Sequence, residues 1–116
     1  MARSMIIDAP KWMLAALNNV YELERKLTAA DQIGLAKRNL DRIKESFLQE
    51  RMFYEDPMGQ PFKDTRTDLD ATISGTGTEN LVVVDVIKPI IRCGESAVSV
   101  VVQKGIVVVE AKQGGQ

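Results

Sequence analysis

Residues 81–110 read LVVVDVIKPIIRCGESAVSVVVQKGIVVVE, and fifteen of them are Val or Ile. Residues 1–60 contain five Val or Ile residues and are rich instead in straight-chain helix formers. β-Branched side chains favour strands, whereas Leu, Lys, Glu, Arg and Ala favour helices. We therefore predict an α+β fold in which a helical part precedes a β part, rather than an alternation of strands and helices.

The β part divides into short strands separated by turn residues. We expect a small, mostly antiparallel β domain with strands over 70–74, 81–87, 90–92, 97–103 and 106–110. Within the fourth of these, Val98, Val100 and Val102 are predicted to face the same way. Lys104-Gly105 fits a two-residue hairpin turn between the last two strands, because Gly tolerates positive φ.

The helical part contains two amphipathic patterns. The first is predicted to start near residues 8–10, where Asp8 suits an N-cap and Pro10 suits the first turn. The second is predicted to start over residues 28–31 and to end before Asp56, where Pro and Gly break a helix. Its apolar residues follow a 3-4-3-4 spacing, which is typical of a heptad seam.

Two helices with apolar stripes cannot cover both stripes in an isolated hairpin. Pairing two copies would form a dimeric four-helix bundle and remove the exposed stripe; the alternative is that the hairpin packs on its own β domain. The boundaries we predict are an extension over 1–8, the hairpin over 9–58, the β domain over 59–112 and a tail over 113–116. The expected dimer interface comprises Met13, Leu17, Val20, Leu27, Ile33, Leu40, Ile43 and Phe47.

Charge and rare residue types exclude several functions. The net charge is −1, and basic and acidic residues are balanced in both halves, so we expect no nucleic-acid partner. No apolar run approaches the roughly 18 residues that span a bilayer, so we expect no membrane partner. The sequence has no His and one Cys, Cys93. We therefore expect no enzymatic activity, no metal and no cofactor, and a reducing, cytoplasmic location.

Four segments follow one another in a characteristic order. Leu23–Leu27 reads LERKL, Ile33–Leu35 reads IGL, Asp56–Phe62 reads DPMGQPF, and Val83–Gly94 is a Val-rich strand with a turn. In this order they resemble the GrpE family, the nucleotide exchange factors of DnaK-type heat-shock chaperones. The matching family segments are LERAL, a Gly-containing helix start, (D/N)PxGExF and VxxVLQKGYxLxG. The chain departs from the family after the third segment, where Lys63–Asp68 (KDTRTD) replaces DPxxHEA.

The resemblance implies a function in protein folding and the stress response. A homodimer joined by helices would use its β domain to open the nucleotide cleft of a DnaK-type chaperone and release ADP. Such a factor binds the open state more tightly than the closed one, lowers nucleotide affinity by linkage and needs no catalytic side chain. The residues that we expect to contact the chaperone are Gly34, Pro61, Phe62, Ile87, Pro89 and Arg92.

Other roles remain open for the chain and for these residues. Gly34 could serve helix packing, Pro61 and Phe62 could anchor the linker, and Ile87 and Pro89 could belong to the core. The alternative function is a non-enzymatic dimeric adaptor or structural interaction module with no exchange activity. In that case an edge of the β domain would recruit a strand from a partner.

Overall fold

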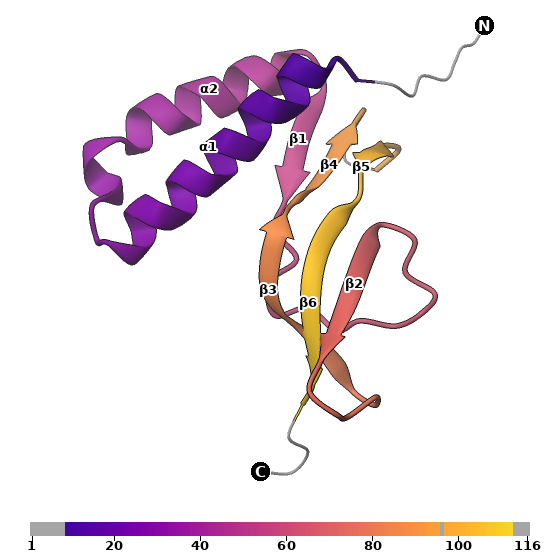
Figure 1. The fold of residues 1–116 in the computed structure, drawn as a ribbon. Coiled ribbons are helices and arrows are strands. Elements are labelled where there is room, and N and C mark those ends of the chain that lie inside the picture. Colours follow the sequence, from indigo (N-terminus) through magenta and orange to yellow (C-terminus); the bar gives the residue numbers. More distant parts are fainter. Residues whose placement is uncertain (1–8, 96, 113–116) are drawn as a thin grey trace, which may run out of the picture. The chain divides into compact units, whose positions relative to one another are not determined.

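The computed structural model describes residues 9–95 and 97–112 (Figure 1). The helical elements in this part of the chain are α1 (Lys11–Ala29), a 3-10 turn η1 (Ile33–Leu35) and α2 (Lys37–Gln49). The strands are β1 (Met52–Glu55), β2 (Leu69–Ser74), β3 (Leu81–Lys88), β4 (Ile90–Cys93), β5 (Val100–Gln103) and β6 (Gly105–Ala111). They form two three-stranded sheets, ordered β1-β4-β5 and β2-β6-β3. The predicted α+β class is confirmed.

The chain divides into two compact units that do not follow the boundaries expected from the sequence. The first combines the residues up to Tyr54 with Ile91–Val102, and the second combines Glu55–Ile90 with the residues from Gln103 onward. Residues 91–102 thus group with the helices rather than with the rest of 59–112, because Ile91 belongs to the core that the helices cover. The expected extension 1–8, with Asp8, and the expected tail 113–116 lie outside the described residues.

The first helix begins where the sequence predicted and ends on a left-handed residue. The Pro10 carbonyl accepts the N–H of Met13 at 3.0 Å. At the other end, Asp31 has a φ of 58°, its N–H donates to the Thr28 carbonyl, and the Gln32 N–H donates to the Leu27 carbonyl. These two bonds form a Schellman motif, which satisfies the last carbonyls of a helix. The prediction that residues 28–31 start the second helix is therefore wrong.

The second helix is shorter than predicted and a strand follows it. α2 ends at Gln49, and Arg51 adopts a φ of 64°, a left-handed conformation that stops a helix. The next residues form β1, and the Arg51 carbonyl accepts the N–H of Gly94 at 2.7 Å. The helix thus ends before Asp56, as predicted, but residues 52–55 form a strand that was not predicted, and Met52 is buried in the core of this unit.

The core of the first unit joins the helical hairpin to the sheet β1-β4-β5. Leu17, Phe47, Met52 and Ile91 form the buried cluster, and Val102 is among the residues packed against it. Burying a large apolar side chain contributes roughly 1.5–3 kcal/mol. Within this unit, the hairpin therefore packs on its own β structure, which was the alternative left open by the sequence.

The second unit is built on the sheet β2-β6-β3. β2 runs parallel to β6 from Leu69↔Gly105 to Ser74↔Glu110. β3 runs antiparallel to β6 from Leu81↔Ala111 to Lys88↔Ile106. The buried apolar residues of this unit include Leu69, Leu81, Val83, Val86, Ile90, Val107 and Val109. They come from all three strands and from Ile90, which follows Pro89.

The predicted hairpin at Lys104-Gly105 is wrong. β5 and β6 belong to different sheets, so the residues between them do not join two paired strands. Gly105 is instead the first residue of β6 and lies opposite Leu69. The predicted strand over 97–103 is also too long, since β5 begins at Val100. Val98 therefore lies outside β5, and both Val98 and Val100 are exposed.

Candidate functional site

The segment Asp56–Phe62 (DPMGQPF) lies along the edge of β3. Its first turn is closed by the Asp56 Oδ1 atom, which accepts the N–H of Met58 at 3.0 Å. Beyond this turn, the N–H groups of Gly59 and Phe62 donate to the carbonyls of Val83 and Leu81. The linker is therefore an ordered addition to the sheet, because its backbone hydrogen bonds are made to β3.

Pro61 lies near the end of this added segment. It forms an isolated antiparallel bridge with Val82, and the neighbouring Gln60 carbonyl accepts the N–H of Val83 at 2.9 Å. Pro61 is exposed, whereas Phe62 is half-buried. The segment thus presents a proline to solvent while Phe62 is partly covered by the unit itself.

Arg66 connects the Pro61 segment to the residues that precede β2. Its Nε and Nη2 atoms donate to the two carboxylate oxygens of Asp68, at 3.0 and 2.9 Å. Its Nη1 atom donates to the Gln60 Oε1 atom at 2.9 Å and to the Pro61 carbonyl at 3.3 Å. The bidentate pair is partly shielded from water, which favours the strong, directional form of this interaction.

Ile87 and Pro89 have different surroundings in the structure. Ile87 is 56% exposed, whereas Pro89 is buried, so Pro89 takes the core role that was its alternative. Ile87 lies at one of two register irregularities in β3; Val84 lies at the other and is also exposed. Such bulges re-aim side chains, so Val84 is a further exposed apolar residue that the sequence pattern missed.

Gly34 and Arg92 belong to the first unit, apart from the other four expected contact residues. Gly34 lies in η1 and is exposed, and no atom lies within 4 Å of the position that a Cβ would occupy there. Helix packing therefore does not require a glycine at this position. Arg92 lies in β4 and is half-buried.

The expected interface residues on the helices fall into two groups. Leu17, Val20, Leu40 and Phe47 are buried within the single chain. Met13, Leu27 and Ile33 are half-buried, and Ile43 is exposed. Exposed apolar residues that the expected set did not include are Trp12, Leu23, Leu35 and Leu48. The heptad pattern found the helix faces but could not separate residues that cover the unit's own sheet from residues that stay exposed.

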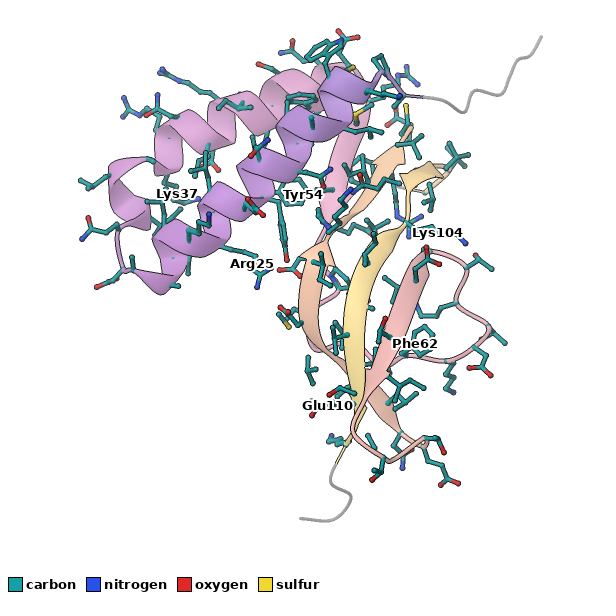
Figure 2. The ribbon with its side chains drawn as sticks, viewed as in Figure 1. Arg25, Lys37, Tyr54, Phe62, Lys104 and Glu110 are labelled. Atoms are coloured by element: carbon teal, nitrogen blue, oxygen red, sulfur yellow. The ribbon has the colours of Figure 1, made fainter. Side chains whose placement is uncertain are left out.

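A polar cluster in the first unit joins both helices to β1. The Glu24 carboxylate accepts the Tyr54 hydroxyl and the Lys44 Nζ atom, the latter at 2.9 Å (Figure 2, where Tyr54 is labelled). Lys44 also lies 5.4 Å from the centroid of the Tyr54 ring, a cation–π distance. No local sequence pattern reveals this cluster, because Glu24 is separated from Lys44 and Tyr54 by 20 and 30 residues.

The charge state of Glu24 follows from these contacts. Its partial burial opposes ionisation and raises its pKa, but the hydrogen bonds from Tyr54 and Lys44, together with the Lys44 charge, outweigh burial. The pKa of Glu24 consequently lies below its usual value. The cluster therefore holds an ionised carboxylate that links the helices to β1, which is a structural role.

A hollow of about 430 Å³ lies beside this cluster, between α2 and β1. Its apolar wall consists of Leu17, Leu48, Met52 and Phe53, and its polar rim consists of Asp41, Lys44, Glu45 and Tyr54. Lys44 and Asp41 are already engaged in ion pairs with Glu24 and Lys37. The hollow therefore has both apolar and polar walls, and the charge of Lys44 is already balanced by Glu24.

The described residues include no group of three or more His, Cys, Asp or Glu side chains placed to hold a metal ion. Among the helices that the structure describes, none is long and apolar enough to span a bilayer. Comparison of the chain with protein-family models, with curated proteins and with solved structures finds no match in any of the three.

Proposed function

We propose that this protein is a GrpE-like nucleotide exchange factor for a DnaK-type chaperone. The observation that carries the proposal is the ordered, partly exposed DPMGQPF segment, which follows a helical hairpin and joins the edge of a Val-rich sheet. The proposal is also supported by the order of the four segments that resemble the GrpE family: LERKL, IGL, DPMGQPF and the Val-rich strand. An exchange factor acts by binding one conformation of its partner more tightly than another, so it requires a shaped surface and no reactive side chain.

The proposed contact surface in the second unit contains Pro61, Phe62 and Ile87. Pro61 and Ile87 are exposed, and both lie on or beside β3. Val84 extends this exposed apolar set along the same strand. An apolar surface on a rigid strand can contact a partner without the loss of entropy that ordering a flexible loop would cost.

We also propose that two copies associate through their helices. The exposed apolar side chains of the hairpin support this proposal, above all Leu35, which is 82% exposed, together with Leu23 and Ile43. Association would remove this surface from water. Light scattering is expected to give twice the chain mass of 12.9 kDa. A mass of one chain across the micromolar range would contradict the dimer.

The decisive experiment measures the release of fluorescently labelled ADP from DnaK-type chaperones. We expect the protein to accelerate release in a saturable manner. An Ile87→Ser variant should weaken the effect, and a Val98→Ser variant is the matched control, because Val98 is an exposed valine outside the proposed surface. Equal rates with and without the protein, and no binding to several chaperones, would overturn the proposal.

A second candidate is an adaptor that recruits a partner strand without exchange activity. The observation that favours it is β2, which pairs with β6 alone in the order β2-β6-β3 and leaves Ile73 exposed. Edge strands readily accept a further strand. Binding of a chaperone or of another protein that leaves ADP release unchanged would support the adaptor over the exchange factor.

A further inference from the structure

We propose that Arg66 is a positioning residue for the surface through which the second unit contacts its partner. The inference rests on the proposed function, because it takes exposed Pro61 and half-buried Phe62 as part of the contact. It adds a residue that does not itself have to touch the partner. Arg66 would fix the conformation of the contact segment in the free protein.

The first step is how the segment is held against the sheet. On the side of β3, Gly59 and Phe62 donate their N–H groups to Val83 and Leu81, and Gln60 accepts from Val83. Proline has no N–H, so the carbonyl is the sole backbone hydrogen-bonding group of Pro61. That carbonyl accepts Arg66 Nη1. The sheet thus holds the backbone of Gly59, Gln60 and Phe62, and the guanidinium holds the Pro61 carbonyl.

The second step is what fixes the guanidinium. Both oxygens of Asp68 hold it in a bidentate pair, in which Asp68 is less exposed than Arg66. The backbone carbonyl of Asp68 accepts the N–H of Gly105, the first residue of β6, at 2.9 Å. Arg66 is therefore tied to the sheet through Asp68. It connects the start of β2 and β6 to the segment that lies along β3.

The third step is why arginine suits this position. The planar guanidinium can donate to Asp68 on one side and to the Gln60–Pro61 pair on the other, because its five N–H donors point in fixed directions. A lysine ammonium could replace the charge but not this geometry. Losing Arg66 would remove the hydrogen bonds to the Gln60 side chain and the Pro61 carbonyl and leave only the bonds to β3. The segment would then be less well ordered, and ordering it would weaken partner binding; we expect about a tenfold effect.

The test uses the full chain and three variants: Arg66→Ala, Arg66→Lys, and the exchanged pair Arg66→Asp with Asp68→Arg. The exchanged pair keeps an ion pair between the two positions but removes the donors to Gln60 and Pro61. Amide hydrogen exchange is read at Phe62 and, as an internal control, at Val107 in β6. Urea unfolding of each variant reports global stability.

We expect exchange at Phe62 to rise about tenfold in all three variants while exchange at Val107 stays within twofold. The affinity for the chaperone should fall in parallel. Unchanged exchange at Phe62, or its restoration by the exchanged pair, would overturn the inference. So would a chaperone affinity that Arg66→Ala leaves unaltered. Failure of the unmodified protein to bind any chaperone would instead remove the proposed function, while the exchange data would still show whether Arg66 orders the segment.

Discussion

Gly105 gives the sharpest test of the second unit, because a single methyl group at this position meets two buried side chains. A Cβ on Gly105 would lie 2.8 Å from Leu69 Cδ2 and 3.0 Å from Ile90 Cγ1. Carbon atoms prefer separations of about 3.5–4.0 Å. Both neighbours would therefore have to move by about 0.5–1.2 Å. Overpacking of this size typically costs about 1–3 kcal/mol, which is the loss we expect for Gly105→Ala in urea unfolding followed by circular dichroism.

Gly34→Ala is the matched control for this measurement. Gly34 has no atom within 4 Å of the added Cβ, and its φ is not in the positive range. Alanine should therefore be neutral or stabilising there, by about 0.4–1 kcal/mol, because it reduces the freedom of the unfolded chain.

A double substitution separates crowding from backbone conformation. Leu69→Ala alone should destabilise the chain by about 2–5 kcal/mol, because Leu69 is buried. The double variant Leu69→Ala with Gly105→Ala should lose less free energy of unfolding than the sum of the two single losses, because the shorter side chain at position 69 leaves room for the methyl group at position 105. Equal stability of the Gly105→Ala and Gly34→Ala variants, or strict additivity of the pair, would refute the packing argument.

The remaining predictions concern the first unit. Leu17→Ala should lower the free energy of unfolding by about 2–5 kcal/mol in urea, because Leu17 is 1% exposed in the core. Glu22→Ala, at an exposed polar site on the same helix, should change it by less than about 0.5 kcal/mol. Tyr54→Phe should cost about 1 kcal/mol at neutral pH by removing a hydrogen bond to ionised Glu24. The pKa of Glu24 is lowered in the folded state, so ionised Glu24 stabilises the fold above its unfolded pKa, and this stabilisation is lost as pH falls through its folded pKa. The difference in free energy of unfolding between Tyr54→Phe and the unmodified protein should therefore become smaller over this acidic range. Ile43→Glu should lower the mass measured by light scattering to that of one chain while shifting the unfolding midpoint little, since Ile43 is 40% exposed.

Local patterns predicted most of the elements correctly. The β-branched runs gave strands close to β2, β3, β4 and β6, and the apolar spacing gave both helices. These features depend on side chains that are near one another in the sequence, which is why composition and periodicity reveal them. The Asp31 turn shows the limit of local signals, because an acidic residue near a helix boundary suits either a start or, in the left-handed conformation, an end.

The pairing of strands could not be predicted in the same way. The parallel pairing of β2 with β6 joins residues more than thirty positions apart, and nothing in either strand specifies its neighbour. β1 was missed because four residues with mixed burial carry too weak an alternation to compete with the preceding helical pattern. Arg66 was missed for a related reason: its contacts with Gln60 and Pro61 depend on the path of the whole loop, whereas the sequence shows a polar segment.

The division of the chain has a consequence for anyone who wishes to dissect it. The polypeptide passes from one unit to the other after Tyr54, after Ile90 and after Val102. A fragment that stops at residue 58 would carry both helices and β1 but neither β4 nor β5, so the hairpin would lose most of the sheet beneath it. Each unit is built from two separate stretches of the chain, so a cut at a single position cannot yield either unit whole.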